Sequence, residues 1–159
     1  MAATNIRSFR HACIVVQDLA LSIRFYVELF GMKLEKLYSV QGTYPEKVFA
    51  RNGVHLLYAK LRFPSERSGK PASLELHEWI RPKIKRSGSV RGHIAFTVSA
   101  LDKEFRRLSS HGIKFISKPI LSPEGHTKIC FCLDPDSNLI ELIEDVSPKR
   151  FTSGKKKGQ

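Results

Sequence analysis

The chain has 159 residues, 42% of them hydrophobic, and a formal net charge of +12, which suits one domain or two small repeats sharing a core. No apolar run is long enough to span a bilayer and no secretory leader is visible, so we expect a cytoplasmic protein that binds no membrane. The basic residues gather in a connector and a tail without a recognition helix or zinc-finger spacing, which argues against nucleic-acid binding.

The first half of the sequence predicts a strand, a helix and further strands. The apolar, β-branched run from Phe9 to Val16 indicates a buried strand. Asp18 then precedes an apolar stripe at helical spacing that ends before Gly31, which predicts a capped helix. Further strands are expected over 34–40, over 47–61 (one strand or two, with a turn at 52–53) and over 73–79, with a polar loop at 63–71.

The same order of elements follows a connector at 81–91. A strand is expected over 92–98, and then a helix that begins with Ser99 and Asp102 as a variant capping box and ends at Gly112. Further strands are expected over 114–117, 127–133 and 139–144, with 134–138 as the turn between the last two. From residue 147 onward the composition predicts a basic, disordered tail.

Three cysteines, Cys13, Cys130 and Cys132, all lie in apolar runs. An odd number of cysteines without a secretory leader indicates reduced thiols in an intracellular protein. Cys130 and Cys132 would lie on one face of a strand. We interpret the cysteines as small buried hydrophobic residues rather than as metal ligands.

The two halves repeat a histidine and a glutamate at equivalent places. His11 and His93 lie in the first strand of each half, and Glu75 and Glu141 lie in the last strand, each within a Leu/Ile-Glu-Leu run. His93 follows His11 by 82 residues whereas Glu141 follows Glu75 by 66, so the first half is longer, and the surplus is placed around 42–71. Internal repeats of this kind normally share one core.

These four side chains, if brought together, would bind one divalent cation. A lone histidine beside an apolar run is more often a core residue, and a glutamate in an alternating strand can simply face water. Recurrence in both halves favours the metal site, because an inward-facing carboxylate needs a strong partner. Nitrogen and carboxylate ligands suit Zn, Ni, Fe, Co or Mn, and such a set leaves room for substrate.

The sequence resembles members of the vicinal oxygen chelate superfamily. This superfamily includes glyoxalase I, methylmalonyl-CoA epimerase, extradiol dioxygenases, fosfomycin-modifying enzymes and bleomycin-binding proteins. The resemblance covers about residues 8–145. It rests on HACIVVQDL at 11–19 with the aromatic residues that follow it, on GHIAFTV at 92–98 and on DPDSNLIEL at 134–142.

The resemblance implies an α+β fold of two βαβββ modules, about 8–80 and 92–146, that form one domain as a curved, half-open barrel. It also implies that His11, Glu75, His93 and Glu141 bind a single divalent metal ion inside the barrel. His77 lies two residues beyond Glu75 on the same strand face, as an alternative ligand or a neighbour of the site. We favour Glu75 because its Leu-Glu-Leu setting repeats that of Glu141.

In the lyase and isomerase members, a metal stabilises an enediolate while a glutamate moves a proton beside the carbonyl. The resemblance therefore implies a metal-dependent lyase or isomerase of the glyoxalase I or epimerase type, with Glu141, or else Glu75, as the catalytic base. An Fe(II) extradiol-type dioxygenase using His11, His93 and Glu141 is one alternative. A ligand-binding or resistance protein of the same fold, without catalysis, is another.

The expected partner is a small oxygenated molecule. The excess of lysine and arginine favours an anionic substrate. Many members of the superfamily dimerise, and the sequence leaves open whether this chain forms a homodimer.

Overall fold

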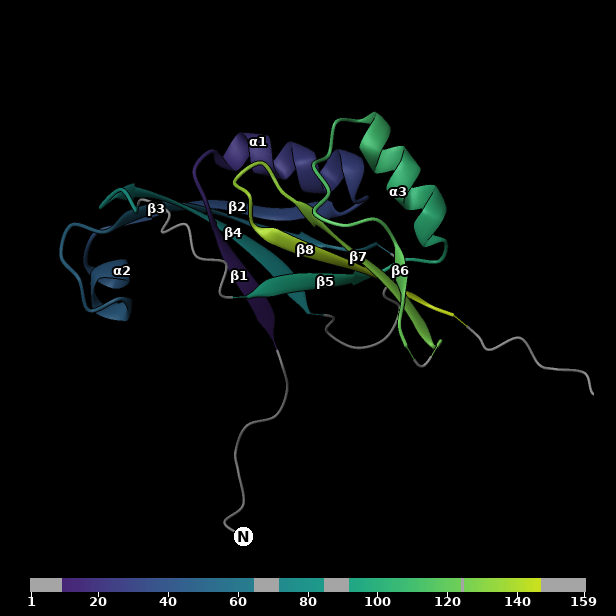
Figure 1. The fold of residues 1–159 in the computed structure, drawn as a ribbon. Coiled ribbons are helices and arrows are strands. Elements are labelled where there is room, and N and C mark those ends of the chain that lie inside the picture. Colours follow the sequence, from purple (N-terminus) through teal and green to yellow (C-terminus); the bar gives the residue numbers. More distant parts are fainter. Residues whose placement is uncertain (1–9, 65–71, 85–91, 124, 147–159) are drawn as a thin grey trace, which may run out of the picture. The chain divides into compact units, whose positions relative to one another are not determined.

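The computed structural model describes residues 10–64, 72–84, 92–123 and 125–146. It divides into two compact units, the first formed by described residues up to 92 together with 133–139, and the second by 93–132 and the residues from 140 onward. Each unit contains one open four-stranded sheet with its helices (Figure 1). Among the described residues, no helix is long and apolar enough to cross a membrane.

The first unit follows the predicted order of a strand, a helix and three strands. Its sheet has the order β1-β4-β3-β2, with β1 parallel to β4 and the other neighbours antiparallel. Helix α1 continues directly into a π-helical turn, η1. The bounds are β1 His11–Val16, α1 Leu19–Arg24, η1 Phe25–Leu29, β2 Lys33–Gln41, α2 Thr43–Val48, β3 His55–Arg62 and β4 Ser73–Arg81.

The predicted ends of the first helix are confirmed. Asp18 is the N-cap, and its Oδ1 accepts a hydrogen bond of 2.8 Å from the backbone N–H of Leu21. Beyond the helical segment, Gly31 adopts a φ of +69°, a left-handed conformation that glycine adopts at little cost. Cap and glycine therefore limit the helix to the segment that packs on β3 and β4.

Strand β4 lies between β1 and β3, and its side chains point alternately to the two faces of the sheet. Side chains alternate along a strand, which places Glu75 and His77 on one face and Leu74, Leu76 and Glu78 on the other. Leu76 is fully buried on the α1 face. An apolar core therefore lies on the opposite side of the sheet from Glu75 and His77.

The prediction of a strand that begins at residue 47 is wrong. The chain instead forms the short helix α2, and β3 begins only at His55. Gly42 turns the backbone at a φ of +84°, and Phe49, just after the helix, packs edge-on against Trp79 with ring centroids 4.9 Å apart. The turn at 52–53 is confirmed. Part of the extra length of the first half therefore forms a helix over the β2–β3 connection.

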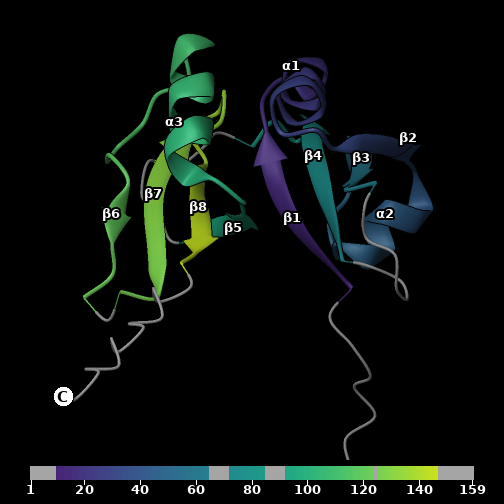
Figure 2. The same cartoon turned by 90° about the vertical axis from the view of Figure 1, so that its right-hand side faces the viewer.

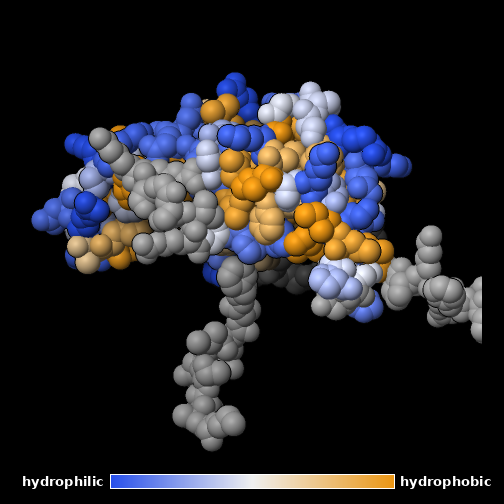
Figure 3. Space-filling view, in the orientation of Figure 1, coloured by the Kyte–Doolittle hydropathy of each residue, from blue (hydrophilic) through white to orange (hydrophobic). Residues whose placement is uncertain are grey.

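The second unit repeats the topology of the first. Its sheet order, β5-β8-β7-β6, matches β1-β4-β3-β2 position by position. Figure 2 shows α3 against this sheet, where Leu101 and Leu108 are buried, while hydrophilic residues predominate on the side of α3 seen in Figure 3. The bounds are β5 His93–Thr97, α3 Leu101–Ser110, β6 Ile120–Leu121, β7 Thr127–Leu133 and β8 Leu139–Asp145.

Two details of the second unit differ from expectation. The segment 114–117 makes only an isolated bridge, between Phe115 and Cys132, and the strand at this place is the two-residue β6. The capping box is also wrong, because Ala100 is the N-cap and no side chain at that position caps the helix. The N–H of Leu101 instead donates to Oε2 of Glu144, 2.8 Å away on β8.

The cysteines are only partly as expected. Cys130 and Cys132 are buried on β7, as expected of small hydrophobic side chains, but Cys13 is exposed on β1. Burial raises the pKa of the Cys130 thiol to about 11.

The expected tail, most of the loop at 63–71 and most of the connector lie outside the described residues. The half-open barrel concerns the placement of the two units and stays a prediction.

Candidate metal centre

In the first unit, His11 and Glu75 lie on neighbouring strands and face each other. His11 opens β1, and the parallel register pairs it with Ser73 and pairs Cys13 with Glu75. This stagger brings Nδ1 of His11 to 3.7 Å from Oε1 of Glu75. The carboxylate side chain is only 15% exposed, whereas the imidazole is 39% exposed. Two of the four predicted ligands therefore lie next to each other within one sheet.

His77 contacts the other oxygen of the same carboxylate. Its Nε2 lies 3.4 Å from Oε2 of Glu75, and its ring packs against Tyr58 with centroids 5.4 Å apart. Burial lowers the pKa of His77, an effect that the neighbouring Glu75 carboxylate opposes. A lowered pKa favours the neutral imidazole, which carries one ring proton at neutral pH.

In the second unit, His93 and Glu141 form the equivalent pair. Nε2 of His93 lies 3.0 Å from Oε2 of Glu141, and the two side chains are 44% and 15% exposed. The His93 ring also meets Phe131 edge-on at a centroid distance of 5.5 Å. Both units therefore present one largely buried carboxylate next to one accessible imidazole.

The structure brings the four predicted ligands together as two pairs, one in each unit. Within either unit, the described part of the chain contains no group of three or more His, Cys, Asp or Glu side chains arranged to hold an ion. Each pair does supply imidazole nitrogen and carboxylate oxygen, the donors that Zn, Ni, Fe, Co and Mn accept. The residues therefore fit a divalent metal chemically, and the complete four-ligand set stays a prediction.

The sequence interpretation missed an aromatic row on the face of the first sheet that carries Glu75. Tyr58 pairs with His77 across β3 and β4 and with Tyr38 across β2 and β3. The two tyrosine rings lie 4.9 Å apart, and Nζ of Lys36 lies 5.9 Å from the centre of the Tyr38 ring. The two tyrosines and the lysine are visible in the sequence, but the strand register that brings them together is not.

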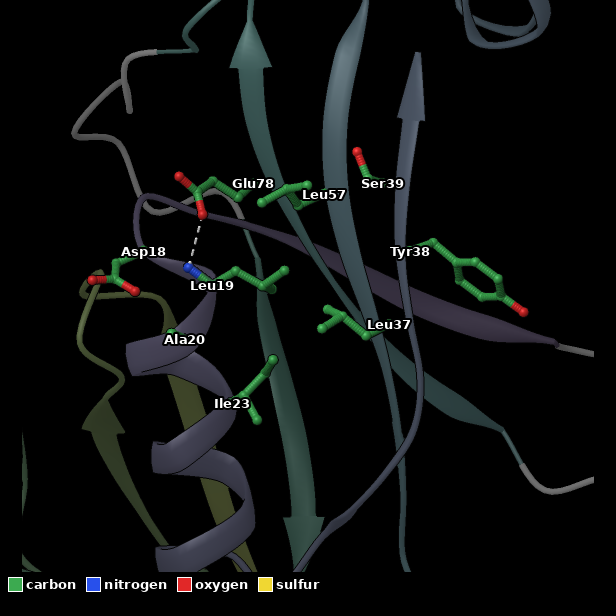
Figure 4. A pocket seen from close by; sticks show the side chains of 9 residues that line it. All are labelled: Asp18, Leu19, Ala20, Ile23, Leu37, Tyr38, Ser39, Leu57 and Glu78. Atoms are coloured by element: carbon green, nitrogen blue, oxygen red, sulfur yellow. Dashed lines mark hydrogen bonds between the residues drawn. The ribbon is translucent and has the colours of Figure 1, made fainter.

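A separate pocket lies on the opposite face, between α1 and the sheet (Figure 4). Its volume is about 460 Å³, and its wall is mainly apolar. Glu78 borders it, and Figure 4 shows Oε2 of Glu78 bonded to the backbone N–H of Leu19, 3.0 Å away, with the Tyr38 ring pointing outward. Because Glu75 and Glu78 point to opposite faces of β4, this pocket is not part of the candidate metal centre.

The turn that precedes Glu141 is built around a buried carboxylate. Asp134 is 5% exposed, and its Oδ1 accepts hydrogen bonds from the N–H groups of Asp136 and Asn138 at 3.0 and 2.6 Å. Its Oδ2 accepts from the Tyr26 hydroxyl and from Nδ2 of Asn138 at 3.1 and 2.7 Å. Burial raises the pKa of Asp134. The Asp134–Asn138 stretch therefore fixes the turn on which β8 begins.

Comparison with known proteins gives a consistent result. The sequence profile of the Glyoxalase/Bleomycin resistance protein/Dioxygenase superfamily matches residues 8–142. Glyoxalase I of Saccharomyces cerevisiae is 35% identical over 149 residues, covering 84% of this chain and 43% of the relative. Lactoylglutathione lyase of Schizosaccharomyces pombe is 32% identical over 169 residues, covering 94% of this chain and 52% of the relative.

Structural comparison supports the same fold. A glyoxalase family protein from Bacillus cereus superimposes with a TM-score of 0.78 at 23% identity, covering 92% of this chain and 99% of that protein. The chain spans about half the length of the two yeast relatives.

Proposed function

Because the chain belongs to the Glyoxalase/Bleomycin resistance protein/Dioxygenase superfamily, we propose that it is a glyoxalase-type lyase that uses one divalent metal ion. The observation that carries the proposal is the His–Glu pair that recurs in both units, His11 with Glu75 and His93 with Glu141. The names of the two yeast relatives favour a lyase over the other activities of the superfamily.

The proposed metal ligands are the two histidines and two glutamates of these pairs. Both carboxylates are largely buried, and each has an imidazole nitrogen against it, which supports an ion as their common partner. When bound, the ion would act as a Lewis acid that stabilises negative charge on a substrate oxygen. The requirement for both pairs predicts that loss of either one abolishes tight metal binding.

Glu141 is the proposed catalytic base. It would take a proton from the carbon beside a carbonyl group and return it to the neighbouring carbon, so that substrate and product are isomers. Nε2 of His93 lies 3.0 Å from Oε2 of Glu141, which keeps this carboxylate beside the proposed histidine ligand of its own unit. The shorter His–Glu distance in the second unit is why we favour Glu141 over Glu75 for this role.

The aromatic row next to Glu75 supports a substrate with an apolar or planar part. Tyr38 and Tyr58 offer ring faces, and Lys36 places a positive charge at the end of the row, where an anionic group would be stabilised. A small, oxygenated, anionic substrate therefore fits the chemistry of this face better than a neutral one.

The test is replacement of Glu141 by Gln in the full chain loaded with a divalent metal. Loss of general-base catalysis costs about 10²–10⁴-fold in rate, so we expect kcat for the isomerisation that yields lactoylglutathione to fall by that factor. The matched control is Glu144→Gln on the same strand, where an amide oxygen can still accept from Leu101 N–H and activity should persist. Full activity in Glu141→Gln removes this residue from the proposed role.

A further inference from the structure

The carboxylate of Glu75 lies between two histidines, one against each oxygen. Nδ1 of His11 lies 3.7 Å from Oε1, and Nε2 of His77 lies 3.4 Å from Oε2. His11 is 39% exposed whereas His77 is 16% exposed, so the two imidazoles have different surroundings. The more buried one lies on the same strand as the glutamate.

Among the described residues of the second unit, this arrangement has no counterpart. The residue two positions beyond Glu141 is Ile143, where the first unit has His77 two positions beyond Glu75. Isoleucine offers no hydrogen bond, so the two glutamates are supported differently. His77 is therefore a feature of this chain's first unit rather than a product of the repeat.

The backbone and a neighbouring ring fix the position of His77. It lies on β4, in register with Val15 of β1 on one side and Tyr58 of β3 on the other. The Tyr58 ring packs on the imidazole at 5.4 Å, which restricts its rotation. Because an ionised carboxylate only accepts hydrogen bonds, the contact with Glu75 requires the ring proton of His77 to be on Nε2.

We propose that His77 is a positioning residue: its Nε2–H donates to Oε2 of Glu75 and thereby directs Oε1 toward the metal on the side of His11. The proposal rests on the proposed function, because it assigns Glu75 as a metal ligand. Residues that hydrogen-bond to a metal ligand orient it, and loss of such a hydrogen bond typically weakens metal binding by about 10–100-fold.

The experiment titrates Co²⁺ into the metal-free full chain and measures its affinity by calorimetry and its ligand set by visible absorption. Two variants separate donation from packing. His77→Phe keeps a ring against Tyr58 but cannot donate, whereas His77→Gln can donate from its Nε2. His55→Phe serves as the matched control, since this histidine lies on β3 beside Ser39, away from Glu75.

We expect His77→Phe to bind Co²⁺ about 10–100-fold more weakly, with His77→Gln recovering most of the affinity and all variants keeping the wild-type spectrum. Wild-type affinity in His77→Phe overturns the proposal while leaving the metal site intact. A changed spectrum in both His77 variants also overturns it, because His77 would then be a ligand. A wild-type protein that binds no Co²⁺ overturns the proposed function and this inference together.

Discussion

Glu78 and Glu144 occupy equivalent positions and make the same contact in their respective units. Each lies three residues beyond a candidate metal ligand, and each accepts a backbone hydrogen bond from the first residue of its unit's helix. Oε2 of Glu78 lies 3.0 Å from Leu19 N, and Oε2 of Glu144 lies 2.8 Å from Leu101 N. The last strand of each unit therefore presents a candidate ligand on one face and holds the helix start on the other.

We expect Glu144→Ala to destabilise the protein by about 1 kcal/mol, the usual cost of losing a helix cap. Glu144→Gln should cost less, because its amide oxygen can still accept from Leu101 N–H. Urea unfolding of the three proteins followed by circular dichroism measures the difference. Equal midpoints for the Ala variant and the wild type would show that this contact contributes nothing to stability.

The buried Asp134 predicts a larger effect. Its two oxygens accept four hydrogen bonds, donated by Tyr26, Asp136 and Asn138, and Asp134→Ala removes all four. We expect a loss of about 2–4 kcal/mol in the free energy of unfolding, typical of a broken buried network. The comparison is Asp136→Ala, since the Asp136 carboxylate accepts a hydrogen bond from Gln17 N–H. This substitution should lower the free energy of unfolding by less.

The same residue predicts a pH dependence. Burial raises the pKa of Asp134 in the folded state above its ordinary value of 3.8, so folding takes up a proton between the two pKa values. The resulting stabilisation is complete below the unfolded pKa and is lost as the pH rises through the folded pKa. Acidification from pH 6 toward the unfolded pKa should therefore shift the stability difference between wild type and Asp134→Asn in favour of the wild type. A constant difference across this range would contradict the assignment.

Metal binding should also appear as added stability. An ion that binds only the folded state at about 100 times its Kd raises the free energy of unfolding by about 2.7 kcal/mol. We expect His93→Ala to lose this gain, measured as the shift in melting temperature on adding Zn²⁺. His126→Ala removes an exposed histidine of the same unit and should keep it. An equal shift in both variants would exclude His93 as a ligand.

The sequence predicted those elements whose signal is local. β1 and β7 each contain an apolar run, at 12–16 and 129–133. Asp18 and Gly31 mark the two ends of the first helical segment with a cap and a left-handed residue. Helix α2 was missed because its six residues are too few to show a helical period. The true cap of α3 was missed because its acceptor, Glu144, lies 43 residues farther along the chain.

The candidate site shows the same limit. Repetition in the sequence was enough to single out His11 and Glu75, and the structure places their side chains in contact across β1 and β4. The approach of His77 to the second oxygen of Glu75 and its packing on Tyr58 depend on strand register and rotamer, which residue types alone do not specify. The supporting residues of the site therefore required the structure.

We expect His11, Glu75, His93 and Glu141 to share one ion. The most direct test is an anomalous difference map from crystals of the metal-loaded protein, collected at the absorption edge of the ion. A shared ion gives one peak at about 2.0–2.2 Å from an imidazole nitrogen of each histidine and a carboxylate oxygen of each glutamate. A peak that lacks either pair, or protein that crystallises from excess metal with no peak at these residues, would contradict it.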